Sequence, residues 1–274
     1  MTPSPAKIPA VPARPLVPVR PGTLRVTEHY PCVEGEGSTL GALTYLVRLS
    51  GCDLRCWWCD SKQSSFFEAE AREQSAASLA SRALKSGAAW VSLTGGEPLW
   101  RGARELAALA SLLKRLKAAG RKVKVETNGR HWLPALDPLV SLWSVAPKWD
   151  SRKAGAARRS PAMDYDLAAL KALAQGPGRQ GRLQIKFVIT GDAQGAPKAR
   201  DLAQARSLLK SLVPLHAGVP VYLTPAGGLP GADYLQRNRL LNDAVARQAR
   251  LWSAWDVRVA PQWHRVLYGD ERKK

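Results

Sequence analysis

The sequence has no run of about 20 apolar residues, which is the length that a membrane-spanning helix requires. Its basic N-terminal residues are followed by neither an apolar core nor a small-residue cleavage site, so we expect no secretory signal. Cysteine is scarce: there are four in 274 residues, and three of them fall within eight positions. That arrangement excludes a disulfide framework, which needs paired and dispersed cysteines. These absences predict a cytoplasmic protein without a membrane anchor, in which clustered thiols bind a metal.

Acidic residues are also few. The 22 aspartates and glutamates stand against 41 lysines and arginines, which gives a formal net charge of +19. A charge of this size is compatible with contact with nucleic acid or a membrane surface. The basic residues form no continuous arm, however, and are spread over residues 101–124, 152–159, 198–210 and 247–274. We therefore favour solvated basic helix faces and a site for small anionic ligands, with nucleic-acid binding as the less favoured alternative.

Residues 1–22 differ in composition from the rest of the chain. Seven prolines occur there, with almost no apolar periodicity. Such a segment cannot bury enough apolar surface to order itself, so we predict a flexible, partly extended tail. Residues 23–274 are enough for one sizeable α/β core, and we predict that they form a single domain.

Beyond residue 24, apolar strand patterns alternate with helical periodicity. Repeated βα units predict a parallel sheet with right-handed crossovers and helices on the outside. About six units can be distinguished, which suits a partial, open βα barrel of about six parallel strands better than a closed eight-stranded one. The predicted strands are residues 44–49, 90–93, 122–125, 139–145, 183–189 and 219–223, with 257–260 as a final edge strand. The predicted helices are residues 71–85, 105–119, 165–174, 199–212 and 233–252.

The most informative stretch is Cys52-Asp-Leu-Arg-Cys56-Trp-Trp-Cys59, directly after the predicted strand 44–49. Three thiolates at this spacing on a loop can bind three irons of a [4Fe–4S] cubane and leave the fourth iron open, which is a catalytic arrangement. A structural zinc site normally takes four protein ligands in two pairs. The alternative is a zinc knuckle that recruits Cys32 or His29 as a fourth ligand.

The pattern Cys-x-x-x-Cys-x-aromatic-Cys resembles the signature of the radical S-adenosylmethionine (SAM) superfamily. The resemblance implies that the open iron binds the amino and carboxylate groups of SAM. One electron from the cluster then releases a 5′-deoxyadenosyl radical that abstracts hydrogen. Trp58 stands at the aromatic position that contacts the adenine there. Thr94-Gly-Gly-Glu97-Pro98, one βα unit later, is similar to the superfamily's Gly-Gly-Glu stretch, whose main chain binds the SAM ammonium and needs glycine for close approach.

Further motifs resemble the 7-carboxy-7-deazaguanine synthase family, over about residues 26–270. They are Glu34-Gly-Glu-Gly37 (Gln-Gly-Glu-Gly in the family), Val47-Arg-Leu-Ser-Gly-Cys52, Cys59-Asp60-Ser61 (Cys-Asp-Thr in the family), Glu126-Thr-Asn-Gly129, Ala146-Pro-Lys148, Lys186-Phe-Val188 and Pro261-Gln-Trp-His264. The implied reaction converts 6-carboxy-5,6,7,8-tetrahydropterin to 7-carboxy-7-deazaguanine with loss of ammonia. The resemblance also implies Mg²⁺, a homodimer and a reducing partner such as flavodoxin or ferredoxin.

The resemblance assigns roles to individual residues. The cluster ligands are the catalytic Cys52, Cys56 and Cys59, and Ser61 binds Mg²⁺. The residues implied to bind SAM are Trp58, Asp60, Gly95, Gly96, Glu97, Asn128, Ala146, Pro147, Lys148 and Thr224. The residues implied to bind the pterin are Val33, Glu34, Gly35, Glu36, Arg48, Thr94 and His264.

The chemistry of a pterin agrees with several of these side chains. A carboxylate such as Glu36 can accept hydrogen bonds from an aminopyrimidinone edge, and Arg48 is a two-pronged cation for a carboxylate. A hydroxyl such as that of Ser61, with substrate oxygens and water, suits a hard cation. Plainer structural interpretations remain open. They are an edge-strand charge for Arg48, turn caps for Glu36 and Ser61, a structural histidine for His264, and an aliphatic stem with a surface charge for Lys186.

The chain departs from the family pattern at two of these positions. Glu34 replaces glutamine and adds a negative charge where the family has an amide near the substrate, and Ser61 replaces threonine. Cys32 has no implied role. Two alternative functions stay open: a radical SAM activase or modifying enzyme for a protein or RNA, and, more remotely, a non-catalytic metal-binding nucleic-acid protein. The second would need a basic stripe interleaved with aromatic residues, which the sequence lacks.

Overall fold

The computed structural model describes residues 18–66, 70–149, 164–229, 233–269 and 271. Most of the proline-rich stretch, residues 1–17, therefore lies outside the described chain. The last residues of that stretch already pack on the domain: Val19 is buried, and Arg20 Nε lies 2.8 Å from Glu73 Oε2. The folded part thus includes Pro18–Gly22, a few residues before the boundary that the composition suggests.

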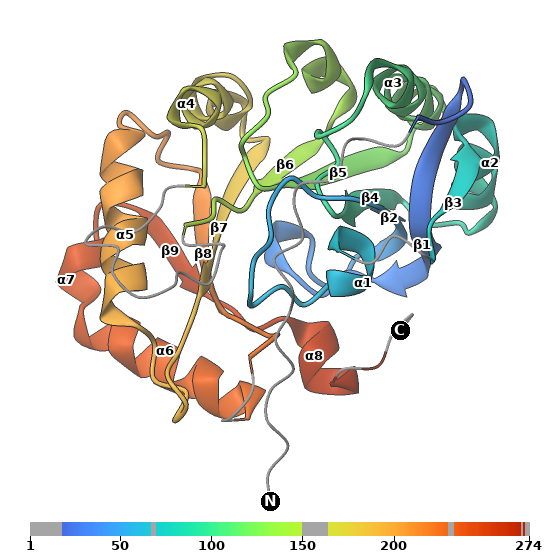
Figure 1. Ribbon diagram of the computed structural model, residues 1–274. Coiled ribbons are helices and arrows are strands. Elements are labelled where there is room, and N and C mark those ends of the chain that lie inside the picture. Colours follow the sequence, from blue (N-terminus) through green and yellow to red (C-terminus); the bar gives the residue numbers. More distant parts are fainter. Residues whose placement is uncertain (1–17, 67–69, 150–163, 230–232, 270, 272–274) are drawn as a thin grey trace, which may run out of the picture.

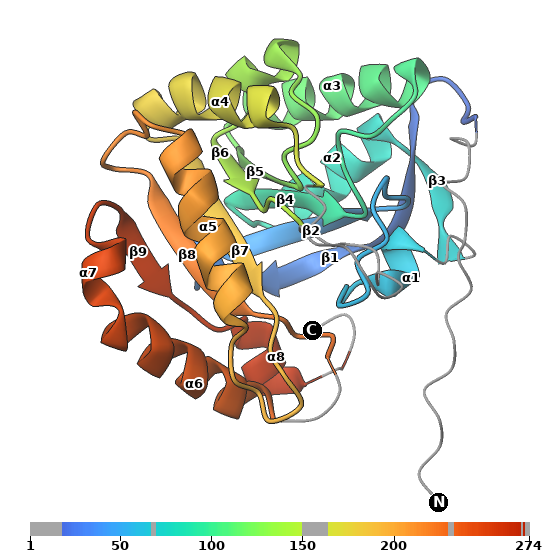
Figure 2. The ribbon, with the colours of Figure 1, turned by 60° about the vertical axis from the view of Figure 1, so that its left-hand side comes forward.

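A single curved sheet of nine strands forms the centre of the molecule, in the order β3-β1-β2-β4-β5-β6-β7-β8-β9 (Figures 1 and 2). From β2 to β9 all neighbouring pairs are parallel, whereas β1 pairs antiparallel with both β2 and β3. The predicted open βα barrel is confirmed, with seven parallel strands where about six were expected. The strands are β1 Thr23–Val33, β2 Leu43–Leu49, β3 Arg72–Ser75, β4 Trp90–Gly95, β5 Lys122–Thr127, β6 Leu142–Val145, β7 Leu183–Ile189, β8 Pro220–Pro225 and β9 Asp256–Val259.

The inner strands alternate strictly between two environments because successive strand residues point to opposite faces. On β5, Val123 and Val125 belong to the hydrophobic core, whereas Glu126 lines the concave pocket and Lys124 pairs with it. Ile185 and Phe187 on β7 are buried in the same core, and Lys186 between them faces the concave side. The apolar core therefore lies between the sheet and the helices, and the inside of the barrel is a polar pocket.

Most helices cover the convex face of the sheet, as both ribbon views show, whereas the short helices at residues 62–65 and 263–268 lie on the side of the pocket. Side chains cap the N-terminal ends of some of them: the Ser75 hydroxyl accepts a hydrogen bond from Ser78 N, and Asp166 caps the helix that follows it. The helices are α1 Lys62–Ser65, α2 Ala76–Lys85, α3 Ala103–Ala118, α4 Leu167–Gln175, α5 Ala199–Ser211, α6 Tyr234–Arg247, α7 Ala249–Trp252 and α8 Trp263–Tyr268, with 3₁₀ turns η1 Gly37–Thr39, η3 Pro134–Leu139 and η4 Pro177–Gln180. Among the described helices, none combines the length and apolarity needed to cross a bilayer.

Four sequence-based assignments were incomplete or wrong. The strand β1 was not predicted, although it is the longest in the sheet. The predicted helix 71–85 begins with β3, which pairs with β1, and becomes helical only after the Ser75 cap. The predicted strand 139–145 starts at Leu142, because Pro134 and Pro138 favour a 3₁₀ turn before it. The predicted helix 233–252 is interrupted at Gln248, whose backbone (φ −109, ψ 22) leaves the helical range.

The turn η1 closes the barrel at the end where the parallel strands begin. Ser38 N donates to Gln184 Oε1 (2.7 Å), and Gln184 Nε2 donates to Ser144 Oγ (2.8 Å). Gly37 has a φ of +68, and a Cβ atom there would overlap the Gln184 amide, so only glycine fits. The pocket consequently opens at the carboxyl ends of the parallel strands, where βα-barrel enzymes carry their active sites.

Candidate active site

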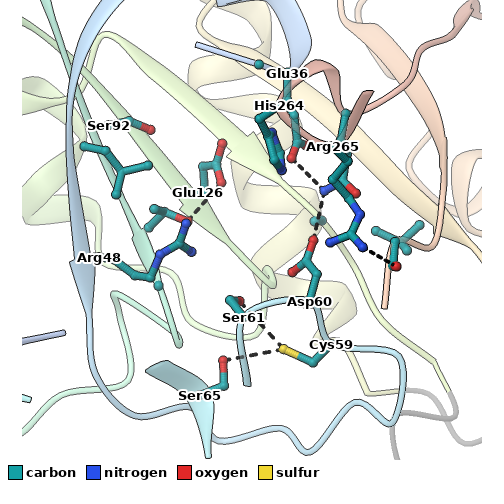
Figure 3. Close-up of a pocket in the computed structure, with 18 of the residues that line it drawn as sticks. Glu36, Arg48, Cys59, Asp60, Ser61, Ser65, Ser92, Glu126, His264 and Arg265 are labelled. Atoms are coloured by element: carbon teal, nitrogen blue, oxygen red, sulfur yellow. Dashed lines mark hydrogen bonds between the residues drawn. The ribbon is translucent and has the colours of Figure 1, made fainter. Parts of the chain in front are cut away.

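A pocket of about 300 Å³ occupies the concave side of the sheet (Figure 3). Its wall combines side chains from β1, β2, β4, β5, β6 and β7 with the cysteine loop and α8. Most of the site residues named from the sequence meet here: Val33, Glu34, Gly35, Glu36, Arg48, Cys52, Cys56, Trp58, Cys59, Asp60, Ser61, Thr94, Gly95, Gly96, Asn128, Ala146, Lys148 and His264. In the described chain, the wall does not include Glu97, Pro147 or Thr224.

The three motif cysteines line this one pocket although the loop that carries them has little regular structure. Leu54 N donates to Cys52 Sγ at 3.4 Å, and Cys59 Sγ lies 3.7 Å from both Ser61 Oγ and Ser65 Oγ. Burial raises the pKa of all three free thiols, that of Cys56 to about 12. Three soft thiol ligands on one pocket wall form a donor set that fits an iron–sulfur cluster with one open iron.

The zinc-knuckle alternative has no counterpart among the described residues. There, no three His, Cys, Asp or Glu side chains are placed to hold a single metal ion. His29 Nδ1 lies 2.7 Å from Tyr45 Oη, and Arg82 approaches its other nitrogen. Cys32 is in the pocket wall, but burial raises its pKa to about 11, and its neighbours are Glu34 and Lys124. Neither residue lies in the cysteine loop's hydrogen-bond network.

The Gly-Gly stretch after β4 packs against the start of the cysteine loop. Gly96 N donates to Leu49 O (2.9 Å), and Glu97 N donates to Gly51 O (2.8 Å). A Cβ atom at Gly95 would overlap the Leu49 backbone, and one at Gly96 would overlap the Gly51 carbonyl. Glycine is therefore required at both positions for packing. Both glycines also line the pocket, as the implied approach of SAM requires.

Glu97 braces the loops behind the pocket wall. The residue is only 1% exposed. Its carboxylate accepts hydrogen bonds from Leu99 N (3.0 Å), Thr127 Oγ1 (2.7 Å) and Asn128 N (2.7 Å). Asn128 Nδ2 in turn donates to Asp53 Oδ1 (2.9 Å) in the cysteine loop. The loops after β2, β4 and β5 are therefore one hydrogen-bonded unit, and burial raises the pKa of Glu97.

Two lysine–carboxylate clusters support the polar wall, which Glu34, Glu36, Glu126 and Lys186 line directly. Lys124 Nζ contacts a Glu34 carboxylate oxygen and lies 2.8 Å from Glu126 Oε1, and Thr94 Oγ1 donates to Glu126 Oε2 (3.0 Å). Lys186 Nζ forms an ion pair with Glu36. Burial acts to raise the pKa of Glu36, but Lys186 and His264 together hold that pKa below its usual value.

Gln262 joins three segments that are far apart in the sequence. Its Nε2 donates to Glu36 Oε1 (2.8 Å) and to Asp60 Oδ2 (2.9 Å), which Figure 3 shows as the two dashed lines between Glu36 and Asp60. His264 follows on α8, and a Cβ atom on Gly35 would come within 2.7 Å of its Nδ1. Burial acts to raise the pKa of Asp60, but Gln262 and Arg48 lower it. The C-terminal segment thereby closes the pocket over the Glu34–Glu36 turn.

Arg48, Trp58 and Lys148 complete the wall. Arg48 is not an edge-strand surface charge: its side chain is 19% exposed, and its Nε lies 2.6 Å from Glu28 Oε1 inside the pocket. Trp58 packs in a small apolar cluster with Leu54 and Cys56. Lys148 Nζ donates to Ala146 O (2.7 Å), and burial lowers its pKa.

Sequence reasoning did not name Lys124, Glu126 or Gln262 as site residues, and left Lys186 undecided. A signal for three of them was present. Lys124, Glu126 and Lys186 each alternate with core residues inside strands that are buried on both faces, where an unpaired charge would be costly. For Gln262 no local pattern gives a signal, because its role depends on the fold bringing residue 262 next to residues 36 and 60.

Comparison with known proteins agrees with this geometry. A family model described as a 4Fe-4S single cluster domain matches residues 33–139. A 7-carboxy-7-deazaguanine synthase from Halobacterium salinarum is 31% identical over 258 residues, which cover 90% of this chain and 91% of that protein. One from Koribacter versatilis is 37% identical over 260 residues, covering 91% and 99%. The chain belongs to the 7-carboxy-7-deazaguanine synthase family. The predicted enzyme class is thereby confirmed, with a [4Fe–4S] cluster and SAM as its cofactors.

The solved structures show the same fold. The crystal structure of QueE from Escherichia coli has a TM-score of 0.58 to this chain, with 20% sequence identity, and the match covers 86% of this chain and 93% of that one. At this identity the likeness concerns the arrangement of the sheet and helices. The residues of the pocket are therefore interpreted from their own contacts.

Proposed function

We propose that this enzyme converts 6-carboxy-5,6,7,8-tetrahydropterin to 7-carboxy-7-deazaguanine with loss of ammonia. Its relatives are named for this product. The observation that carries the proposal is that one pocket combines the three motif cysteines with a wall of paired lysines and carboxylates. A pocket of about 300 Å³ that is closed by η1 at one end suits a small molecule. A bicyclic pterin with one carboxylate has the size and polarity for it.

The residues present fit the two cofactors. Cys52, Cys56 and Cys59 would hold the cluster, and Gly95 and Gly96 line the same pocket, where their main chain can meet a ligand. Further residues that face the pocket and would contact SAM are Trp58, Asp60, Asn128, Ala146 and Lys148. When both cofactors are bound, they supply a carbon-centred radical that abstracts hydrogen from the substrate.

The remaining wall would bind the pterin. Arg48, Lys186 and His264 offer cationic or hydrogen-bonding partners for the substrate carboxylate, and Glu36 and Glu126 can accept from the aminopyrimidinone edge. The hydrogen bond from Gln262 and the ion pair with Lys186 hold Glu36 in one orientation before substrate arrives. Such preorganisation reduces the entropy lost on binding.

Further parts of the proposal concern ligands and partners that the family resemblance implies. Ser61, whose hydroxyl is in the pocket wall beside Cys59, would bind Mg²⁺ together with substrate oxygens and water. A flavodoxin or ferredoxin would reduce the cluster, and two copies of the chain would form a homodimer. A cytoplasmic location agrees with four free cysteines, which a reducing compartment preserves.

Anaerobic reconstitution with iron and sulfide, followed by reduction with SAM, Mg²⁺ and the tetrahydropterin, tests the function. We expect 7-carboxy-7-deazaguanine by mass spectrometry, and its loss together with the cluster absorbance in Cys56→Ala. The matched control is Cys32→Ala, which should keep its iron content because Cys32 lies outside the cysteine loop. Cysteine-dependent 5′-deoxyadenosine without the deazaguanine would contradict the substrate and favour a protein or RNA substrate. No radical product from a fully loaded enzyme would contradict the enzyme class.

A further inference from the structure

Lys124 is an unusual residue for the inside of a parallel sheet. It lies on β5 between the core residues Val123 and Val125, and its side chain is 1% exposed. Its Nζ is shared by two carboxylates, Glu34 from the loop after β1 and Glu126 from its own strand. A buried ammonium group is stable only where such partners compensate for its lost hydration. The two carboxylates hold the pKa of Lys124 above its usual value although burial acts in the opposite direction.

The buried charge of Glu34 relies on Lys124 for compensation more than the charge of Glu126 does. Its side chain is 11% exposed, and one of its oxygens accepts from the backbone N of Gly35 (3.1 Å) while the other contacts Lys124. Burial raises the pKa of Glu34, and Lys124 opposes that rise. Glu126 has further support from the Thr94 hydroxyl and from the charge of Lys186. Removing Lys124 would therefore leave Glu34 as a buried carboxylate beside a second one.

The other charged groups around this pair are balanced among themselves. Glu36, the next carboxylate along the turn, pairs with Lys186 from β7, and Arg48 from β2 pairs with Glu28. Cys32 on β1 also faces Glu34, but its thiol is neutral at physiological pH because its pKa is raised to about 11. No neighbour among these can replace the charge of Lys124 without giving up its own partner.

Glu34 also fixes the turn that carries Glu36. The backbone of Glu34 exchanges hydrogen bonds with Gly41 and Ala42, and its carboxylate accepts from Gly35 N. Residues 33–36 all line the pocket. At position 34 the family motif that this turn resembles has glutamine, a neutral side chain that needs no cation beside it. The carboxylate at position 34 is therefore tolerable only with a buried positive charge beside it.

We propose that Lys124 is a positioning residue that neutralises Glu34 and fixes Glu34 and Glu126 on the pocket wall, and thereby sets the affinity for the pterin. The inference rests on the proposed function for the identity of the ligand, but the ion pair itself does not. Lys124 acts through the two glutamates and through the turn at residues 34–36. The charge at Glu34 and the charge at Lys124 thus form one unit that can be removed together.

Four variants test this unit: Glu34→Gln, Lys124→Met, the double variant Glu34→Gln/Lys124→Met, and Lys122→Met. Lys122 is the matched control because it lies on the same strand but is exposed, with its ammonium group over the Trp90 ring. Binding of 6-carboxypterin, an oxidised analogue, is followed by fluorescence without turnover, and KM and kcat are measured on the reconstituted enzyme. The measurements are made at about pH 6 and about pH 8.

We expect Lys124→Met to weaken binding and raise KM by at least about tenfold at the higher pH, with a smaller effect on kcat, because an uncompensated buried charge is strongly unfavourable. The loss of affinity in Lys124→Met should be smaller at the lower pH, because protonation of Glu34 removes the uncompensated charge and makes the side chain resemble glutamine. The double variant should recover most of the affinity that Lys124→Met loses at the higher pH, and its affinity should no longer depend on pH, whereas Lys122→Met should bind like the wild type. A purely structural role for Lys124 would give neither the pH dependence nor the rescue.

Two outcomes would overturn the inference: a double variant no better than Lys124→Met, or a Lys124→Met deficit that is equal at both pH values. If Lys124→Met does not fold, the double variant must still fold and bind, since it has no unpaired carboxylate at position 34. Urea unfolding of the wild type, the two single variants at positions 34 and 124 and the double variant gives the coupling between these positions independently of any ligand. If the unfolding measurements show this coupling but the wild type binds no pterin, the proposed function is contradicted and the inferred ion pair is not. If the wild type binds the pterin but the unfolding measurements show no coupling between positions 34 and 124, only the inference about Lys124 is contradicted.

Discussion

The backbone of Gly96 lies directly against the carbonyl group of Gly51, so that a Cβ atom at position 96 would overlap that oxygen. This contact presses the stretch after β4 onto the first residues of the cysteine loop. The neighbouring hydrogen bonds, Gly96 N to Leu49 O and Glu97 N to Gly51 O, measure 2.9 and 2.8 Å. The position of Cys52 is therefore determined partly by the absence of a side chain 44 residues later in the chain.

We expect Gly96→Ala to displace the cysteine loop and to lower the free energy of unfolding by about 1–3 kcal/mol, as overpacking of a close contact does. Cluster incorporation should fall with it. The measurements are urea unfolding by circular dichroism and iron content after reconstitution.

Gly218→Ala is the control for that variant, because Gly218 is exposed and an added Cβ would make only ordinary contacts with His216. The control should change the stability by a few tenths of a kcal/mol at most. Wild-type stability and iron content in Gly96→Ala would show that the loop does not depend on this contact.

Gln262 bridges Asp60 and the Glu36 turn, because its amide donates a hydrogen bond to each of these two carboxylates. Gln262→Glu should therefore be more harmful than Gln262→Ala, because it places a third negative charge between them. We expect about 1–3 kcal/mol of lost stability for the alanine variant and more for the glutamate variant. Urea unfolding and the KM for the pterin check the order.

The control for the added charge is Gln194→Glu, which lies in an exposed turn away from the pocket wall. It should leave both the stability and KM unchanged. If the alanine and glutamate variants of Gln262 had equal effects, the electrostatic part of this interpretation would be wrong.

The family and most of the pocket could be predicted from the sequence because the chemistry is concentrated in short motifs. The cysteines, the Gly-Gly stretch and the Glu34–Gly37 turn each lie within a few residues, and the fold only has to bring them together. The parallel strands could be predicted for a similar reason, since runs such as residues 183–189 are strongly apolar. Each of these signals is local.

The parts that could not be predicted depend on partners distant in sequence. β1 has mixed polarity because its residues alternate between a pocket and a covering helix, and β3 exists only because β1 offers it a free edge. The strand around Lys124 indicates that its charge is buried, but its partner Glu34 lies 90 residues away and no local pattern identifies it. Whether Glu97 or Thr224 contacts SAM stays a prediction, although the carboxylate of Glu97 is already satisfied by Leu99, Thr127 and Asn128.

His131 Nε2 lies 3.0 Å from Asp53 Oδ2, and this interaction gives a prediction with a defined sign. The hydrogen bond to Asp53 raises the pKa of His131 above its ordinary value of 6.5, against the effect of burial. Because the folded-state pKa is the higher one, the stabilisation by this pair is complete below about pH 6.5 and is lost as the pH rises through the folded-state value. The half-buried position of His131 makes the energetic effect small, so the pKa itself is the better measurement.

NMR titration of the four histidines in cluster-free protein would measure the pKa of His131 directly. The His131→Gln variant assigns its resonance. We expect His131 to titrate above, and His29 below, the ordinary value, because burial and Arg82 lower the pKa of His29. In Asp53→Asn the pKa of His131 should fall and that of His29 should stay unchanged, since His29 contacts Tyr45 and Arg82 instead. A His131 pKa at or below the ordinary value in the wild type would show that Asp53 does not hold His131 against the cysteine loop.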